Sequence, residues 1–390
     1  MQKMLSVYIH IPFCKQKCLY CDFLSSPASA GEKEAYVEAL LREMEREAVG
    51  YKEYVVDTVF LGGGTPSLLE SRQLESIMDT LHKFYCVTPM AEITIECNPA
   101  TADFEKLKNF RSMGINRISI GLQTADEEQL KCLGRIHNYT DFLDTYHNAR
   151  KAGFENINID LMQALPKQSF ESCMETLEKV IALKPEHISA YSLIVEQETP
   201  FYEKYGPDKP FEMLLPDEDT ERAMYQATGK RLKEAGYNRY EISNYARENK
   251  ECRHNTAYWV GKDYVGFGIG AASYVKGIRF SNTSDRKRYE DFFLTKKWEE
   301  ILSLNGIKEQ VQELTEKEKM EEYMFLGLRM MKGVSKKEFL DRFAVDMESI
   351  YGDVLQKQKK AGLLEEDTDR IFLTERGIDV SNVILADFLL

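Results

Sequence analysis

The 390-residue chain lacks several features that mark common classes of protein. It has no run of about 18 apolar residues, so no segment is long enough for a membrane-spanning helix. It also lacks an excess of positive charge, because 51 Lys and Arg stand against 64 Asp and Glu. The net charge of −13 argues against non-specific nucleic-acid binding. With 29% charged and 43% hydrophobic residues and no low-complexity segment, the composition is typical of a folded protein of two or three domains.

The N-terminus shows no secretory signal peptide, since its apolar stretch MQKMLSVYIHIPF is short and is interrupted by Pro12 and Cys14. We therefore expect a cytoplasmic protein, in which cysteine thiols stay reduced. The eight cysteines are then interpreted as metal ligands, reactive thiols or buried residues, and a disulfide-stabilised scaffold is excluded.

Short β-rich runs alternate with amphipathic helical stretches over residues 1–250, which predicts an α/β fold with a parallel sheet. Six strand–helix units are fewer than the eight of a closed barrel, so we expect an open, partial (β/α)6 barrel. The predicted strands are Ser6–Pro12, Val55–Leu61, Glu92–Glu96, Arg117–Leu122, Ile157–Leu161 and His187–Ile194.

The pattern changes from about Glu316. Helical stretches there precede the segment LLEEDTDRIFLTERG, which predicts a two-stranded β-ribbon with a turn at 367–369. Helices followed by a small ribbon indicate a winged-helix-like α+β module over residues 316–390, and the acidic composition favours a packing or docking role for it. Residues 251–315 are interpreted as a connecting segment with a β-like extension, whose glycines in VGFGIGAASY permit close packing.

Cys14, Cys18 and Cys21 form the pattern C-x3-C-x2-C in the loop after the first predicted strand. Three thiolates within one short loop are able to hold an iron–sulfur cluster. A closed zinc site is the alternative, but it normally needs a fourth protein ligand, and only His10 lies nearby, inside the strand. Three ligands on a four-iron cluster leave one iron open for a substrate or cofactor.

The remaining cysteines carry weaker signals. Cys86, Cys97, Cys132 and Cys173 have no metal-like spacing and are interpreted as buried hydrophobic residues. Cys252 lies two residues before a histidine, but two ligands are too few for a metal site.

The segment CKQKCLYC, followed downstream by GGGTP, resembles the radical S-adenosylmethionine (SAM) superfamily. In that superfamily SAM chelates the open iron of a [4Fe–4S] cluster, and its reductive cleavage yields a 5′-deoxyadenosyl radical. The resemblance implies that the three cysteines hold this cluster and that Gly63, Gly64 and Thr65 hydrogen-bond the amino end of SAM. Taken without this resemblance, the GGG run indicates only a backbone that approaches a neighbouring group closely, or a flexible turn.

Glu96, Gln123 and Asp160 stand at the ends of the third, fourth and fifth predicted strands. The chemistry of parallel barrels gathers at the C-terminal ends of the strands, so the three together favour a ligand site. Each one taken singly also fits a helix cap or a sheet-end polar group.

Six stretches narrow the resemblance to the branch that contains oxygen-independent coproporphyrinogen III oxidase and, closest to this sequence, the haem chaperone HemW. They are VYIHIPFC, FLGGGTPSLL, TIECNP, RISIGLQ, LGRIH and INIDLMQALP, and the likeness covers most of the chain. It implies that Tyr20 occupies the place of the oxidase's aromatic contact to a second SAM. The other implied SAM contacts are Tyr8, Gly63, Gly64, Thr65, Glu96, Gln123, Arg135 and Asp160.

Two departures separate the sequence from the oxidase. Phe23 stands where the oxidase has an additional cysteine, and a phenyl ring cannot replace a thiol in proton or hydrogen transfer. Only about five residues precede the first predicted strand, whereas the oxidase has an N-terminal extension over its active site. Both argue against coproporphyrinogen decarboxylation, so whether the chain is an enzyme stays open. The intact SAM-contact set keeps a radical SAM oxidase or decarboxylase of coproporphyrinogen III, or of a related porphyrinogen, as the alternative.

The segment His254-Asn255-Thr256-Ala257-Tyr258-Trp259 matches the H-N-x-x-Y-W signature associated with HemW. A neutral imidazole suits haem iron as an axial ligand, and Tyr258 and Trp259 offer flat apolar surface for a porphyrin face. The alternative is a histidine that is hydrogen-bonded within an aromatic loop.

The resemblance therefore predicts a chaperone that binds haem as its cargo and delivers it to haem proteins, with a [4Fe–4S] cluster and SAM as cofactors. Respiratory haem proteins are among the expected acceptors, and a homodimer is expected from the resemblance alone. No nucleic-acid partner and no transmembrane segment are expected.

Overall fold

Six parallel strands in chain order form the centre of the main sheet, as the sequence predicts. The structure is a computed structural model that describes residues 2–296 and 306–390. Branched aliphatic side chains favour these strands, and Val7, Ile9 and Ile11 of the first strand are fully buried. The strands are β1 (Lys3–Ile11), β2 (Tyr54–Gly63), β3 (Val87–Cys97), β4 (Arg117–Gln123), β5 (Ile157–Gln163) and β6 (His187–Ser192).

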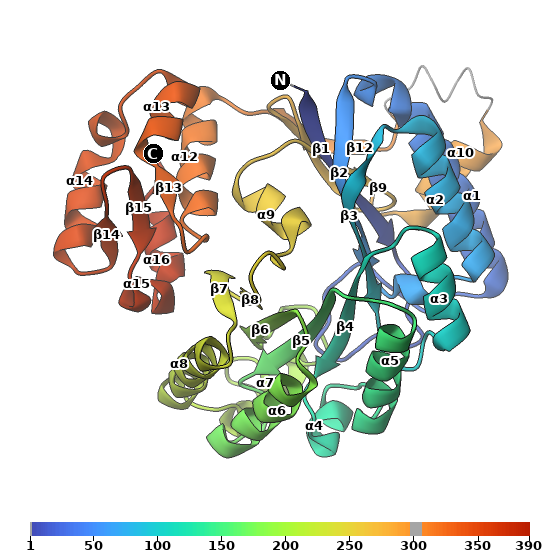
Figure 1. The fold of residues 1–390 in the computed structure, drawn as a ribbon, viewed down its shortest axis with the longest axis horizontal. Coiled ribbons are helices and arrows are strands. Elements are labelled where there is room, and N and C mark those ends of the chain that lie inside the picture. The colour runs from blue at the N-terminus through green and yellow to red at the C-terminus, as the bar shows by residue number, and fades with distance from the viewer. Residues whose placement is uncertain (1, 297–305) are drawn as a thin grey trace.

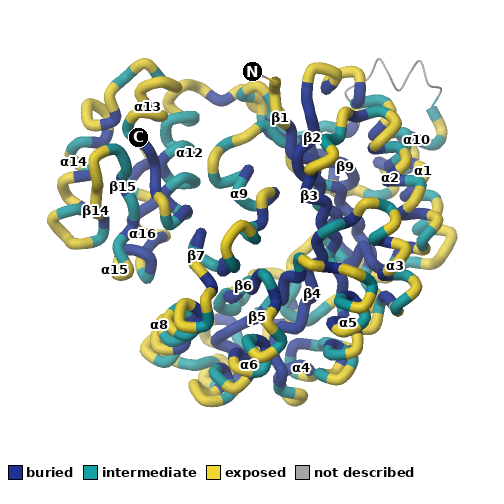
Figure 2. Tube along the Cα trace, in the orientation of Figure 1, coloured by how far each residue is buried: buried dark blue, intermediate teal, exposed yellow. Residues whose placement is uncertain are grey.

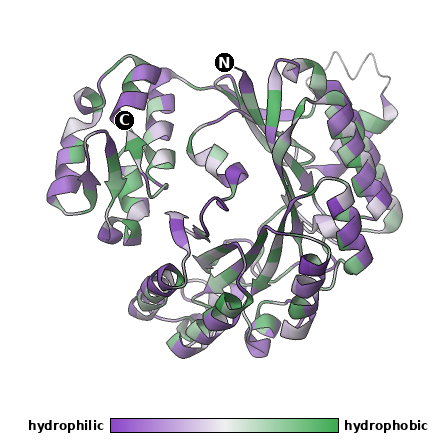
Figure 3. Cartoon of the chain, in the orientation of Figure 1, coloured by the Kyte–Doolittle hydropathy of each residue, from purple (hydrophilic) through white to green (hydrophobic). Residues whose placement is uncertain are grey.

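Helices connect these strands and cover the outer face of the curved sheet (Figure 1). The first helix begins with a capping box between Ser29 and Glu32 and buries Tyr36, Leu40 and Met44, which lie one turn apart on one face. Figures 2 and 3 show the result, a buried, apolar sheet under helices whose outer faces are exposed and polar. The helices are α1 (Ala30–Glu47), α2 (Ser71–Phe84), α3 (Phe104–Ser112), α4 (Glu127–Cys132), α5 (Tyr139–Lys151) and α6 (Phe170–Leu183).

The sheet extends beyond the six predicted strands at both edges. The hairpin β7 (Asn238–Glu241) and β8 (Asn244–Ala246) adds to β6, and β9 (Tyr264–Phe267) pairs in parallel with β1. The sheet of the described residues has twelve strands and remains open, since its order ends at β12 and β7. The other added elements are α7 (Tyr202–Tyr205), α8 (Glu218–Glu234), β10 (Ala272–Val275), β11 (Ile278–Asn282), α10 (Arg286–Thr295) and β12 (Lys308–Glu313).

The C-terminal residues form an α+β module with a hydrophobic core of its own, which includes Phe339, Tyr351 and Leu355. The predicted ribbon turn is present, because Asp367 pairs with Arg370 through the backbone. The module comprises α12 (Glu316–Gly327), β13 (Val334–Ser335), α13 (Lys336–Phe343), α14 (Met347–Lys360), β14 (Leu364–Glu366), β15 (Arg370–Leu373), α15 (Glu375–Asp379) and α16 (Ser381–Ala386).

The short helix α9 (Arg253–Trp259) lies inside the opening of the sheet, between the strands and the C-terminal module (Figure 1). It contacts both β2 and α12. A backbone hydrogen bond also joins the module to the sheet edge, from the Met331 N–H to the Tyr240 carbonyl at 3.0 Å. In the part of the chain that the structure describes, no helix has the length and apolar character needed to cross a membrane.

Candidate functional site

The cysteine-bearing loop follows β1 and is held by backbone hydrogen bonds at several points. The Cys14 N–H donates to the Ser26 carbonyl at 3.1 Å, and the Leu19 N–H donates to the Leu133 carbonyl at 3.0 Å. Cys14, Cys18 and Cys21 are free thiols of intermediate exposure. All three line one cavity of about 420 Å³, called the cysteine cavity below.

Two of the three sulfur atoms accept hydrogen bonds from neighbouring strands' loops. The Thr65 hydroxyl donates to Cys14 Sγ at 3.6 Å, and Arg135 Nη1 donates to Cys18 Sγ at 3.5 Å. The thiolate is the form of cysteine that binds metal. Among the described residues, no three His, Cys, Asp or Glu side chains are grouped as for a single metal ion. Three thiols line the shared cavity, which is the ligand number of a cluster with one open iron, whereas a closed zinc site normally has four protein ligands.

The glycine-rich end of β2 brings the backbone close to the cysteine loop. Gly63 has a φ of 107°, and a Cβ there would lie 2.4 Å from the ring of His10. A Cβ on Gly64 would lie 2.7 Å from the Phe13 carbonyl oxygen. The strand end therefore admits no side chain at either position, and the backbone itself lines the cavity.

Glu96 fixes this strand end, because its Oε2 accepts a hydrogen bond from the Gly63 N–H at 2.9 Å. Burial, and to a lesser extent the nearby Asp160 carboxylate, raises the pKa of Glu96 to about 8. Asp160 is held in turn by Asn158 Nδ2 at 2.7 Å and by the Ser119 hydroxyl at 3.2 Å. Burial also raises the pKa of Asp160, so two buried carboxyl groups share the inner face of β3 and β5.

Gln123 ends β4 with a φ of 72°, an uncommon backbone conformation for a residue other than glycine. The β4–β5 register shifts at this point, which turns the chain at the rim of the cavity. The Tyr191 hydroxyl donates to Gln123 Oε1 at 3.3 Å. Arg135 crosses the same rim, where its Nη2 donates to Asn98 Oδ1 at 3.0 Å and to the Gly121 carbonyl.

Most of the residues predicted to bind the cluster or SAM line the cysteine cavity. Thr65 lies behind the cavity wall, where it donates to Cys14, and Tyr8 lines a different cavity. Asn98 and Tyr191 also line the cavity but were not predicted from the sequence. Asn98 directly follows β3 and Tyr191 is next to the end of β6, so the gathering of site residues at the C-terminal ends of strands was the signal that could have found them. The predicted residues in the wall are Cys14, Cys18, Tyr20, Cys21, Gly63, Gly64, Glu96, Gln123, Arg135 and Asp160.

The interpretation of the other cysteines is wrong for Cys86, which is exposed at the turn before β3. Cys132 is half-buried, whereas Cys97 and Cys173 are buried as expected. Spacing alone does not report burial, because a turn residue between two buried elements is free to face solvent.

A second cavity of about 270 Å³, called the inner cavity below, lies between the inner face of the sheet and α9. Its wall includes Tyr8, His254 and Tyr258, and it shares Glu96 and Asp160 with the cysteine cavity. Side chains two residues apart on a strand face the same side, and β2 to β6 each contribute residues to both cavities, whereas β1 contributes only Tyr8, to the inner cavity.

His254 is 1% exposed and uses both ring nitrogens within the protein. Its Nδ1 pairs with the Thr58 hydroxyl at 2.9 Å and its Nε2 pairs with the Tyr258 hydroxyl at 3.0 Å. Burial, with a smaller contribution from Arg117, lowers the pKa of His254 to about 3. The imidazole is therefore neutral at physiological pH, but neither nitrogen is free to ligate iron in this arrangement.

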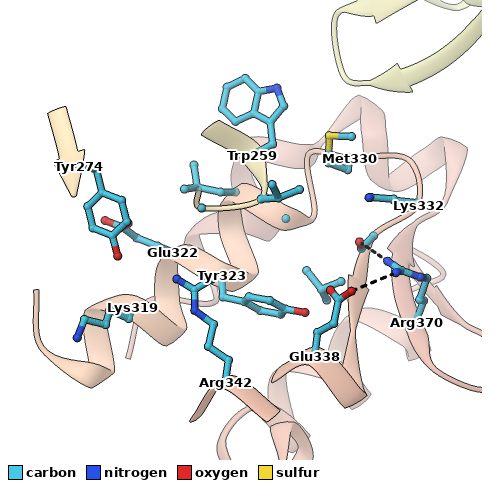
Figure 4. A pocket seen from close by; sticks show the side chains of 16 residues that line it. Trp259, Tyr274, Lys319, Glu322, Tyr323, Met330, Lys332, Glu338, Arg342 and Arg370 are labelled. Atoms are coloured by element: carbon cyan, nitrogen blue, oxygen red, sulfur yellow. Dashed lines mark hydrogen bonds and ion pairs between the residues drawn. The ribbon is translucent and has the colours of Figure 1, made fainter. Parts of the chain in front are cut away.

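Trp259 does not lie with His254. It lines a small cavity of about 60 Å³ between α9 and the C-terminal module, together with Met330 and Tyr323 (Figure 4). The Arg329 guanidinium lies 4.4 Å from the centre of the indole ring. The H-N-x-x-Y-W segment therefore places its histidine and tyrosine in the inner cavity and its tryptophan at the module interface.

Comparisons with known protein families match two parts of the chain. Residues 8–180 match the radical SAM superfamily, and residues 314–380 match the HemN C-terminal domain. The first match contains the cysteine loop and every strand end of the cysteine cavity up to β5.

Curated relatives extend the likeness to the full length. The chain is 35% identical to the Heme chaperone HemW of Bacillus subtilis, with 99% of each chain covered. It is 40% identical to the Heme chaperone HemW of Escherichia coli over 68% of this chain and 69% of that one. It is also 30% identical to the mitochondrial radical S-adenosyl methionine domain-containing protein 1 of Danio rerio, covering 99% of this chain and 86% of that one.

Among solved structures, the coproporphyrinogen III oxidase HemN from Escherichia coli has the same fold, with a TM-score of 0.85. The alignment covers all of this chain and 90% of that one at 24% sequence identity. The likeness includes the C-terminal module as well as the partial barrel, so the two parts are arranged alike in both proteins.

Proposed function

The chain belongs to the HemW family of radical SAM proteins, and from this premise we propose that it is a haem chaperone, which binds haem and passes it to haem-accepting proteins. The likeness to HemW relatives over 99% of both chains carries the proposal. A short shared domain would transfer only a cofactor site, whereas this likeness includes the cysteine loop, α9 and the C-terminal module.

The radical SAM superfamily uses a [4Fe–4S] cluster and SAM, and the cysteine cavity supports the same pair in this chain. We assign the cluster to Cys14, Cys18 and Cys21, with Thr65 and Arg135 as donors to two of the sulfur atoms. When bound, the cluster and SAM supply one-electron chemistry. The residues assigned to SAM are Tyr8, Tyr20, Gly63, Gly64, Thr65, Glu96, Gln123, Arg135 and Asp160.

The protein's own groups orient this site. Glu96 holds the glycine-rich strand end through the Gly63 N–H, which leaves the neighbouring backbone facing the cavity. Arg135 ties the cysteine loop to the ends of β3 and β4 through Asn98 and Gly121. A ligand in the cavity therefore meets a preorganised set of donors.

For haem we propose that the H-N-x-x-Y-W segment takes part through both of its faces. Tyr258 and His254 line the inner cavity, and Trp259 faces the C-terminal module. An axial role for His254 would require the loss of the hydrogen bond at the nitrogen that ligates iron, so we assign His254 to the positioning of Tyr258.

Haem transfer tests the proposal. The cluster-loaded protein is charged with haem anaerobically, separated from free haem and mixed with a haem-free acceptor protein whose bound spectrum is known. We expect the acceptor to gain its haem-bound spectrum faster when the charged protein is the haem donor than when haem-loaded serum albumin is the donor. Failure to bind haem, or retention of haem in the presence of excess acceptor, would contradict a chaperone role.

The second candidate function is a radical SAM oxidase or decarboxylase of coproporphyrinogen III or a related porphyrinogen. The gathering of nearly all proposed SAM contacts around one cavity favours it. Against it, Phe23 lines that cavity with 60% of its surface exposed and offers no transferable proton at the place of the oxidase's cysteine.

Four broader assignments accompany this proposal. We propose a cytoplasmic location, supported by eight free cysteines, and haem acceptors that include respiratory proteins. A homodimer is proposed as the oligomeric state. We also propose a division into residues 1–250, 251–315 and 316–390, supported by the separate hydrophobic core of the last part, with residues 297–305 outside the described structure.

A further inference from the structure

Arg117 begins β4, and its side chain lines the inner cavity. It is 1% exposed, and no described residue accepts a hydrogen bond from its Nε or Nη2. Arginine remains charged at physiological pH and carries five N–H donors, so burial without an acceptor is costly. The inner cavity thus contains a fixed positive charge whose donors are unused by the described protein groups.

The nearby carboxylates are engaged elsewhere. The Asp160 carboxylate accepts hydrogen bonds from the Asn158 amide and the Ser119 hydroxyl. Glu92 accepts from the backbone N–H groups of Arg253 and His254, at 3.1 and 3.0 Å. None of these contacts reaches Arg117, so the guanidinium has no ion-pair partner within hydrogen-bonding distance among the described residues.

Glu96 is the second carboxyl group that lines the cavity, beside Asp160, and it accepts a hydrogen bond from the Gly63 N–H. The Asn255 side-chain amide also lines the cavity and makes no hydrogen bond to another described residue. The wall therefore offers an unused guanidinium and an unused amide, the combination that binds a carboxylate through charge-assisted hydrogen bonds.

We propose that Arg117 and Asn255 form a carboxylate-binding site for the cargo, and that the ligand is a propionate group of haem. This inference rests on the proposed function, because the two propionates are the ionised groups that the haem macrocycle carries. The inner cavity is small for a whole macrocycle but adjoins the cysteine cavity through Glu96, Ser119 and Asp160. A propionate arm therefore reaches Arg117 while the ring lies towards the larger opening.

The test compares haem with haem dimethyl ester, in which both carboxylates are blocked. Binding of each is followed by absorbance with the full-length protein, with Arg117→Gln and with Arg253→Gln. Arg253 is the matched control, because it lies on α9 and pairs with Asp57, with 48% of its side chain exposed. We expect wild type and Arg253→Gln to bind haem about tenfold more tightly than the ester. Arg117→Gln should bind both alike, at the affinity of the ester.

Three results would overturn the inference. Equal affinity of the wild type for haem and its ester would exclude a propionate site while leaving haem binding, and hence the proposed function, intact. Weaker binding of both porphyrins by Arg117→Gln would assign the arginine a structural role. Loss of SAM affinity in Arg117→Gln, measured by calorimetry with unchanged haem binding, would assign the carboxylate to SAM instead of the cargo.

Folding of the variant is checked by circular dichroism, and Arg117→Lys provides a second substitution that keeps the charge. It should retain part of the preference for haem over the ester, since one ammonium replaces the bidentate guanidinium. The comparison of acid with ester in the wild-type protein needs no variant and decides the inference even where both substitutions prevent folding.

Discussion

The two adjoining cavities are lined by the same strands but use their polar groups in different ways. In the cysteine cavity the proposed ligands come from a half-exposed loop and from strand ends. In the inner cavity the polar groups come from the strands before their ends and from α9. Both nitrogens of His254 are bonded there, and no described residue accepts a hydrogen bond from Arg117 Nε or Nη2. The difference indicates an accessible site for a resident cofactor beside a buried site that selects a charged group of the ligand.

The largest effect is expected at the cysteine loop. Replacement of Cys14, Cys18 or Cys21 by serine should abolish the visible absorption of the reconstituted cluster, because three thiolates are the minimum for this site. Cys86→Ser is the control, since Cys86 is exposed and lines neither cavity. A cluster spectrum of wild-type intensity in all three loop variants would show that the cluster does not bind in the cysteine cavity.

The next effect concerns the strand end between the two cavities. Gly63→Ala should lower the free energy of unfolding by about 2–4 kcal/mol, because the methyl group meets the His10 ring in addition to the unfavourable φ. Gly114→Ala has a similar φ of 89° with open space around its Cβ, so it should cost only about 1 kcal/mol. Urea unfolding measures both, and equal losses would show that the close contact with His10 contributes nothing.

The inner cavity should make stability depend on pH through His254. Its pKa is lowered to about 3, so below pH 6.5 the unfolded chain binds a proton that the folded chain does not. The free energy of unfolding should therefore fall as the pH drops from 6.5 towards 3, by about 2 kcal/mol between pH 6.5 and pH 5. His254→Gln should remove this part of the slope in urea unfolding at several pH values. An identical slope in both proteins would mean that His254 is accessible and titrates normally.

The smallest effect is expected at Phe23, at the mouth of the cysteine cavity. With 60% of the residue exposed, Phe23→Ala should change the free energy of unfolding by less than about 0.5 kcal/mol. Phe23→Ser should retain the cluster spectrum as well. A loss of the cluster in either variant would show that the phenyl ring shields the site instead of merely occupying the place of a thiol.

The sequence was sufficient for the features that depend on local order. The cysteine spacing, the position of Glu96 next to the end of β3 and the C-terminal ribbon all lie within short segments whose periodicity or motif is readable. The predicted strand end at Asp160 is wrong, because β5 continues to Gln163 and places Asp160 at its middle. The added edge strands β7 to β12 were not separately predicted, because they are short and are stabilised by pairing with β6 and β1.

The inner cavity needed the tertiary structure. Arg117 stands at the start of an apolar strand. A sequence pattern does not tell whether a charged side chain at such a position is exposed to solvent or buried. Only the return of α9 into the sheet opening, more than 130 residues later, places Asn255 in the same cavity. The separation of Trp259 from His254 has the same origin, since neighbouring positions on a short helix face opposite partners.

Incubation with coproporphyrinogen III tests the central claim most directly. The reconstituted protein is kept anaerobic with SAM and reductant, and decarboxylated product is quantified alongside 5′-deoxyadenosine. A chaperone that carries Phe23 at this cavity should form no decarboxylated porphyrinogen, while the same preparation binds haem and transfers it to an acceptor. Decarboxylated product in stoichiometric amount or above would contradict the account and identify the protein as an oxidase.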